Sequence, residues 1–142
     1  MRKVLLTKKL KENTAKLFEG IPDIELVTIP DGAQEQFDAH IKDAEALLLS
    51  TAYKMTKEVI ERAANLKVIS RTGVGVDNVD VKAATEKGIL VLNTPEANSI
   101  SVAEHTLALI VAISKQLVMY DSELRAGNFA IRRTNKSADI DG

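Results

Sequence analysis

The stretch VISRTGVGVDNVDVKAA, residues 68–84, decides which fold this chain adopts. It begins with a short apolar run and passes through Arg71 into the turn Gly73-Val74-Gly75. A helical pattern follows, which Asp80 is placed to cap and which runs to about Lys87. A strand, a glycine turn and a helix in this order form the repeating unit of parallel α/β sheets. The stretch therefore predicts one such unit.

Similar units lie on both sides of this stretch. Strands are predicted at 4–6, 25–29, 46–49, 67–70 and 89–92, and helices at 9–18, 34–43, 56–63, 80–87 and 101–120. Thr56 is expected to cap its helix, Gly88 to follow the end of another, and Ser101 with Glu104 to form a capping box. Five serial units require a parallel sheet with right-handed crossovers and helices on both faces. We predict an α/β fold with a doubly wound, five-stranded sheet in the flavodoxin-like order 2-1-3-4-5. The Rossmann-like order is the alternative.

Composition narrows the classes of function. The 142 residues suffice for one ordinary domain, and 45% hydrophobic with 27% charged residues is typical of a globular protein. A net charge of −1 does not favour nucleic acid or an anionic membrane as a partner. The absence of cysteine excludes disulfides, thiol nucleophiles and cysteine-ligated metals, and it fits a cytoplasmic protein. The longest apolar run, 107–113, is far below the roughly 20 residues of a membrane span. Nothing in the sequence suggests a metal site.

The glycine turn does not match a dinucleotide site. The fingerprint G-x-G-x-x-G requires a third glycine, and Asn78 stands there instead. The next strand is followed by Asn93 where an acidic residue would hold the ribose, and Asp77 places a negative charge beside the turn. With positive φ angles, Gly73 and Gly75 would instead form a small nest of N–H groups suited to a carboxylate. The alternative is a tight turn that binds nothing.

Polar residues directly follow the predicted strands. They are Thr7, Ser50-Thr51, Arg71-Thr72 and Asn93-Thr94. Ligands of parallel α/β sheets bind beyond these carboxyl ends. We expect Ser50, Arg71 and Asn98 to converge with the amides of the glycine turn on one small anion, with Arg71 supplying the charge. Alternatively, Arg71 makes a structural salt bridge and Asn98 only begins the long helix.

Residues 71–113, RTGVGVDNVDVKAATEKGILVLNTPEANSISVAEHTLALIVAI, carry a more specific signal. They combine G-V-G-x-D-N-V-D, K-G-I-x-V-x-N-T-P and N-S-x-S-V-A-E-H-T at matching spacings. In this the chain resembles the D-isomer-specific 2-hydroxyacid dehydrogenases, especially their D-3-phosphoglycerate dehydrogenase branch. The resemblance implies a flavodoxin-like substrate domain and an inserted Rossmann domain that binds NAD. It also implies hydride transfer between a 2-hydroxy acid and a 2-oxo acid.

The resemblance also implies roles for particular residues. Val74 and Gly75 match the loop whose amides bind the substrate carboxylate, and Val74 also approaches the nicotinamide. Asn98 matches the asparagine before the S-x-S-V-A-E helix, and Arg71 matches an arginine common in the phosphoglycerate branch. Thr106 is expected near the cofactor. Residues 1–98 would form the substrate domain, and 99–142 the first helix and connector of a nucleotide-binding domain.

Two departures from the family limit these expectations. Ser50 stands where phosphoglycerate dehydrogenases often carry an arginine for the substrate phosphate, which argues against a phosphorylated substrate unless Lys54 compensates. The family's cofactor glycines and its catalytic Arg, carboxylate and His match positions beyond Gly142, and neither His40 nor His105 maps onto that His. We therefore predict no catalytic residue in this chain, which would be inert alone although its parent is an NAD-dependent enzyme.

Two other functions remain open from the sequence. One is a non-catalytic module that binds a small carboxylate or regulates a partner. The other is an interaction domain, because the run 107–113 makes its helix apolar all round and a surface helix shows only one apolar stripe. Such a helix predicts a homodimer through residues 101–120.

Overall fold

The computed structural model describes residues 1–140. The chain divides into two compact units, Met1–Ala97 and a second unit that begins at Asn98. This division falls one residue before the boundary expected from the sequence. The first unit contains the sheet, and the second consists of helices.

The sheet has five parallel strands. They are β1 (Arg2–Leu6), β2 (Ile24–Thr28), β3 (Ala46–Leu49), β4 (Val68–Arg71) and β5 (Leu90–Leu92). The strand order is β2-β1-β3-β4-β5, which confirms the flavodoxin-like order and excludes the Rossmann-like alternative. Because all strands run the same way, the residues after β1, β3, β4 and β5 lie along one edge of the sheet.

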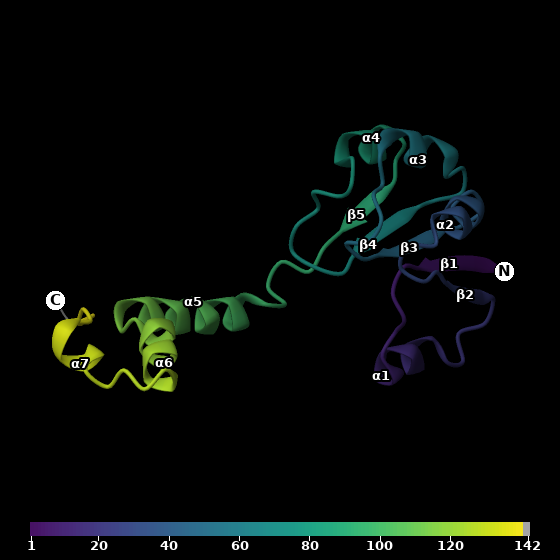
Figure 1. The fold of residues 1–142 in the computed structure, drawn as a ribbon. Coiled ribbons are helices and arrows are strands. Elements are labelled where there is room, and N and C mark those ends of the chain that lie inside the picture. The colour runs from purple at the N-terminus through teal and green to yellow at the C-terminus, as the bar shows by residue number, and fades with distance from the viewer. Residues whose placement is uncertain (141–142) are drawn as a thin grey trace. The chain divides into compact units, whose positions relative to one another are not determined.

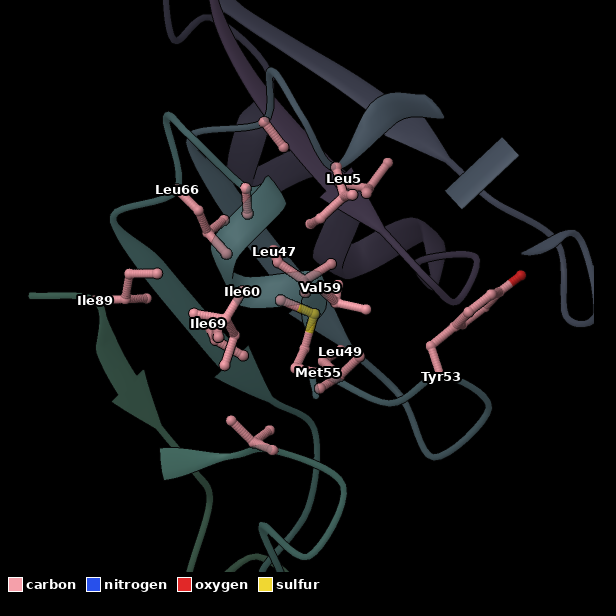
Figure 2. Packing of buried hydrophobic residues seen from close by; sticks show 14 of the residues in the cluster. Leu5, Leu47, Leu49, Tyr53, Met55, Val59, Ile60, Leu66, Ile69 and Ile89 are labelled. Carbon is pink, nitrogen blue, oxygen red and sulfur yellow. The ribbon is translucent and has the colours of Figure 1, made fainter. Parts of the chain in front are cut away.

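Three helices cover one face of the sheet (Figure 1). They are α2 (Gln34–His40), α3 (Lys57–Arg62) and α4 (Val81–Glu86). Alternate strand residues such as Leu5, Leu47 and Ile69 point toward them and are fully buried, as the period of two in a strand requires (Figure 2). Ile60 of α3 and Met55 of the preceding loop complete the centre of this core.

The opposite face of the sheet is less protected. A right-handed crossover from β1 out to the edge strand β2 places α1 (Glu12–Ala15) and the 3-10 turn η1 (Lys16–Phe18) on this side (Figure 1). The predicted helix over 9–18 is therefore only partly correct. Neither short helix buries a residue, so no apolar contact extends them. Leu90 and Leu92 stay about half exposed on this face.

The predicted helix ends are confirmed in part. The Asp80 carboxylate accepts a hydrogen bond from the Ala83 amide at 2.9 Å, and Gly88 adopts a φ of 71° just after α4. Thr56 occupies the N-cap position of α3, but its hydroxyl donates to Glu58 Oε2 at 2.7 Å instead of accepting from an amide. This hydrogen bond holds the pKa of Glu58 below its usual value.

Two lysines connect separate elements of the first unit. Lys3 Nζ on β1 donates to Asp43 Oδ2 at 2.5 Å, which lowers the pKa of Asp43 and raises that of Lys3. The ammonium of Lys87 closes the C-terminal end of α3. It donates to the carbonyls of Ile60, Glu61 and Ala63 at 2.7, 2.8 and 3.2 Å.

The second unit corrects the prediction of one long helix. Its helices are α5 (Ser99–Ser114), α6 (Leu117–Arg125) and α7 (Ile131–Thr134). Asn98, not Ser101, is the N-cap of α5, so the expected capping box is not formed. Within residues 1–140, no single helix is both long and apolar enough to cross a membrane. The pair α5–α6 meets that criterion only when taken together across a 57° bend.

Residues 135–138 fold back and form hydrogen bonds at the break between α5 and α6. Gln116 lies in the left-handed region with a φ of 50°, and the Ala138 amide donates to the Ser114 carbonyl at 2.9 Å. That carbonyl would otherwise accept from the next helical turn. Asn135 donates to the side chain of Gln116, and Gln116 Nε2 donates to the Lys136 carbonyl at 3.2 Å. Tertiary contacts therefore end α5 where local helix propensity would continue it.

Candidate functional site

Thr7 and Ser50 form the base of the carboxyl edge of the sheet, where β1 and β3 end side by side. Thr7 is fully buried, and its Oγ1 accepts from the Ser50 amide at 2.7 Å. The Ser50 hydroxyl lies 3.2 Å from the Thr7 carbonyl, to which it donates, and accepts from the Ala52 amide at 3.3 Å. Ser50 therefore lies at the predicted edge with its proton already used. Its role toward a substrate stays a prediction.

Arg71 ends β4 with its guanidinium folded into the loop that follows. The residue is only 8% exposed. Its Nε donates to Asn78 Oδ1 at 3.1 Å and its Nη1 to the Thr72 carbonyl at 2.7 Å. No ion pair joins Arg71 to a carboxylate of residues 1–140, so the structural salt bridge considered above is not formed there. A buried cation with only neutral partners favours a bound anion.

The glycine turn presents free amides beside this cation. The Gly73 amide donates to the Arg71 carbonyl at 3.0 Å, but in the described part of the chain the Val74 and Gly75 amides donate to no protein acceptor. The Gly73 carbonyl accepts from the Thr94 amide at 3.0 Å, and the Val74 carbonyl accepts from Asn93 Nδ2 at 2.8 Å. The residues after β5 thus hold the turn by its carbonyls and leave two N–H groups for a ligand.

The expected reason for the two glycines is wrong. Neither Gly73 nor Gly75 has a φ in the left-handed region, so no nest of alternating handedness is formed. A Cβ at Gly73 would lie 2.7 Å from Arg71 Nη1, and one at Gly75 would lie 2.8 Å from Asp77 Oδ2. A side chain at position 73 would therefore displace the buried Arg71, whereas one at position 75 would displace only the exposed Asp77.

Asn78 joins the two loops of the site, a role that the sequence did not reveal. Its Nδ2 donates to the Ser50 carbonyl at 2.9 Å and to the Tyr53 carbonyl at 2.8 Å, while its Oδ1 accepts from Arg71. The Asn78 carbonyl accepts from the Met55 amide at 2.8 Å. The only signal in the sequence was a polar residue two positions before the N-cap aspartate, at the position of the missing third glycine.

The geometry of this loop does not fit the pyrophosphate of NAD. A dinucleotide turn needs a third glycine for close approach of the helix, whereas the Asn78 amide fills that position with hydrogen bonds to protein atoms. The following helix, α4, begins at Val81, and the Asp80 carboxylate already accepts from the Ala83 amide in its first turn. The Arg71 guanidinium and the two free amides are donors of the kind that bind a carboxylate.

A shallow cavity of about 330 Å³ lies beside the two loops. Its walls are formed by residues 54–58 and 77–80. Lys54 is among them, on the exposed rim, so its predicted contribution to anion binding stays a prediction.

Asn98 and Thr106, the other two predicted site residues, belong to the second unit. Asn98 precedes α5, and its side chain makes no capping hydrogen bond. Thr106 Oγ1 donates to the Val102 carbonyl at 2.7 Å within α5. Their roles toward substrate and cofactor stay predictions. Ser50, Arg71, Val74 and Gly75 lie together in the first unit, at the ends of β3 and β4.

Known proteins resemble this chain over most of its length. Residues 4–138 match the model of the D-isomer specific 2-hydroxyacid dehydrogenase catalytic domain. The chain is 44% identical over 133 residues to D-3-phosphoglycerate dehydrogenase of Methanocaldococcus jannaschii, covering 94% of this chain and 25% of that protein. It thus spans about a quarter of the length of the curated relatives it matches.

Two solved structures share the fold. D-lactate dehydrogenase from Aquifex aeolicus, complexed with NAD and lactic acid, is 30% identical with a TM-score of 0.76, over 89% of this chain and 38% of that one. NAD-dependent formate dehydrogenase from Staphylococcus aureus is 26% identical with a TM-score of 0.79, over 99% and 46%. The match to the family model and the sequence identity to its members show that the chain belongs to the D-isomer specific 2-hydroxyacid dehydrogenase family.

Proposed function

We propose that the first unit binds the carboxylate of a small 2-hydroxy or 2-oxo acid, as part of an NAD-dependent oxidoreductase that interconverts D-2-hydroxy acids and 2-oxo acids. The observation that carries this proposal is the buried guanidinium of Arg71, which has no carboxylate partner in residues 1–140 and lies beside free amides. The relatives support the reaction class, because those compared are named as dehydrogenases of 2-hydroxy acids or of formate.

Two kinds of group at the edge would recognise the acid, one by its charge and the other by the direction of its hydrogen bonds. Arg71 supplies the positive charge, and the N–H groups of Val74 and Gly75 fix the direction of the carboxylate by donating hydrogen bonds to its oxygens. We propose that the pyrophosphate of NAD is bound outside the first unit, because the glycine turn does not fit it, and that Val74 and Thr106 contact the cofactor from this chain. The second unit would then be the first part of the nucleotide-binding domain, and Asn98 would reach the substrate.

The binding test uses the isotope-labelled chain and two matched probes. Pyruvate is expected to shift the NMR signals of the Val74 and Gly75 amides, whereas pyruvamide, which replaces the carboxylate with a neutral amide, is not. Arg71→Met is expected to weaken pyruvate binding by about tenfold or more, the effect of one charge-assisted hydrogen bond. Lys54→Met, on the exposed rim, is the control. Equal shifts with both probes would contradict the proposal.

Ser50 leads us to propose an unphosphorylated substrate. Its neutral hydroxyl already donates to the Thr7 carbonyl, so it offers no charge to a phosphate. We expect the chain to bind glycerate and 3-phosphoglycerate with similar affinity. A markedly higher affinity for 3-phosphoglycerate that Lys54→Met abolishes would instead assign Lys54 to the phosphate.

We also propose that the 142-residue chain alone transfers no hydride. Hydride transfer requires a nicotinamide held against the substrate carbon and an acid–base group within hydrogen-bond reach. The groups proposed to bind the acid are the Arg71 guanidinium, the Ser50 hydroxyl and the Val74 and Gly75 amides, none of which serves as that acid or base at neutral pH. NADH oxidation with hydroxypyruvate, glyoxylate or 2-oxoglutarate should not exceed the blank. A rate above the blank would refute this part of the proposal.

The apolar surface of α5 supports self-association into a homodimer. At helical spacing, one side of α5 carries Ile100, Leu107, Ile110 and Val111, and another side carries Val102, Leu109 and Ile113. Leu107 is 64% exposed. Covering such surface releases about 25 cal/mol per Å². We expect a dimer by light scattering, lost in Leu107→Glu and kept in the control Leu17→Glu, because Leu17 lies in η1. A monomer at high concentration would exclude this interface.

A further inference from the structure

Asn78 does more than close a turn, because it is the neighbour that determines where the Arg71 guanidinium points. Its two Nδ2 protons go to the Ser50 and Tyr53 carbonyls at 2.9 and 2.8 Å. A flipped amide would place its oxygen against both carbonyls and its NH₂ against the guanidinium, losing all three hydrogen bonds. The Asn78 orientation is thus determined by its surroundings, and Oδ1 must face Arg71 Nε.

This hydrogen bond leaves one end of the guanidinium available. Nε is used by Asn78 and one proton of Nη1 by the Thr72 carbonyl, while Nη2 has no hydrogen-bond acceptor in residues 1–140. No buried side-chain nitrogen or oxygen in that range lacks a partner, so Nη2 reaches solvent. The donors that remain free are therefore those at the open end, beside the glycine turn.

Asn78 is suited to this task because it is neutral. An aspartate at this position would also accept from Nε, but it would neutralise the cation and face two carbonyl oxygens that now receive protons. The asparagine holds the guanidinium by one hydrogen bond and leaves its charge for a ligand.

We propose that Asn78 is a positioning residue for the substrate carboxylate and acts through Arg71. The inference rests on the proposed function, because it requires the anion at Arg71 to be the substrate. It adds that the affinity for the acid depends on the orientation of Arg71, which a residue without substrate contact controls.

The test combines a double-mutant cycle with a spectroscopic readout on the isotope-labelled 142-residue chain. Pyruvate is titrated into the wild type, Asn78→Ala, Arg71→Met and the double variant. Asn65→Ala is the control, since Asn65 is exposed and makes no side-chain hydrogen bond within the described residues. We expect Asn78→Ala to weaken pyruvate binding by about tenfold and to have no further effect when Arg71 is already Met. We also expect the Arg71 Nε–H signal to move without ligand in Asn78→Ala but not in Asn65→Ala.

A second variant covers the case in which Asn78→Ala does not fold. Asn78→Asp preserves the shape of the side chain, and we expect it to weaken pyruvate binding at least as much because it neutralises Arg71. Unchanged affinity in a folded Asn78 variant would overturn the inference alone, as would an effect that adds to that of Arg71→Met. If wild-type Val74 and Gly75 signals do not respond to pyruvate, the proposed function fails, and the inference fails with it.

Discussion

Replacing Gly73 by alanine should destabilise the first unit, whereas the same change at Gly75, two residues away, should not. Both new Cβ atoms would meet a side-chain atom at too short a distance, 2.7 Å from Arg71 Nη1 and 2.8 Å from Asp77 Oδ2. The two variants differ in the side chain that must move away from the new Cβ atom. Arg71 is 8% exposed and hydrogen-bonded on both sides, while Asp77 is exposed.

The expected magnitude follows from the hydrogen bonds at risk. Moving the guanidinium from the new Cβ breaks its bonds to Asn78 and Thr72, each contributing about 1 kcal/mol or somewhat more. Since Gly73 does not adopt a left-handed φ, alanine also restricts the unfolded chain, which stabilises by about 0.4–1 kcal/mol. Gly73→Ala should therefore lower the free energy of unfolding by about 1–2 kcal/mol. For Gly75→Ala only the stabilising contribution and a rotation of Asp77 remain, so the change should lie within about 0.5 kcal/mol of zero.

Urea denaturation followed by tyrosine fluorescence measures this difference in the first unit alone. The chain has two tyrosines, and Tyr120→Phe leaves only Tyr53, which stacks on Phe37 in the core with ring centroids 4.6 Å apart. All variants are made in that background. Equal stability of the two alanine variants would refute the reasoning, because it would mean that the Arg71 guanidinium is not held in place. Arg71→Met should also remove the penalty of Gly73→Ala, since no guanidinium is left to displace.

Three further predictions concern stability. Lys87→Met leaves three carbonyls at the end of α3 without their ammonium, and urea denaturation should show a loss of about 1 kcal/mol. The control Lys82→Met should change stability by less than about 0.5 kcal/mol, since its ion pair is exposed. Asp80→Ala should cost about 1 kcal/mol in the same assay because it removes a side-chain cap, whereas Thr56→Ala removes no such cap and should cost less. The pKa of Asp43 lies below its ordinary 3.8 because its lysine partner donates a hydrogen bond to it. Its contribution to stability is therefore present above about pH 3.8 and is lost as the pH falls through the lower folded value. Asp43→Asn should make urea stability less dependent on pH in this range, and an unchanged acid dependence would contradict the assignment.

The fold of the first unit was predictable because its signals are local and periodic. Short stretches such as 46–49 and 67–70, with aliphatic residues at their centres, predict strands by themselves. Asp80 begins helix α4 with a side-chain cap and Gly88 follows its end with a positive φ, and neither needs a distant partner. Five such units in series leave few ways to build a parallel sheet. The choice of edge for the site also followed, since ligands of parallel sheets bind where the strands end.

Where the prediction failed, a distant contact decides the structure. The helix expected over 101–120 breaks at Gln116 because residues 135–138 return and bind the carbonyl and side chains at the break. No window of sequence around Gln116 contains that contact. The helix expected over 9–18 shortens for the opposite reason, because no neighbouring element buries its apolar side.

Residue types and their order along the chain thus determined the sheet, its strand order and the edge at which Arg71 and the glycine turn meet. Only the tertiary structure decided how that edge is built: which atoms Arg71 donates to, which amides stay free, and why a side chain at position 73 would displace Arg71. The physical reason is the distance along the chain over which each interaction acts. Strand and helix signals act over a few residues, whereas the orientation of Arg71 depends on Asn78, which is itself held by carbonyls more than twenty residues away along the chain.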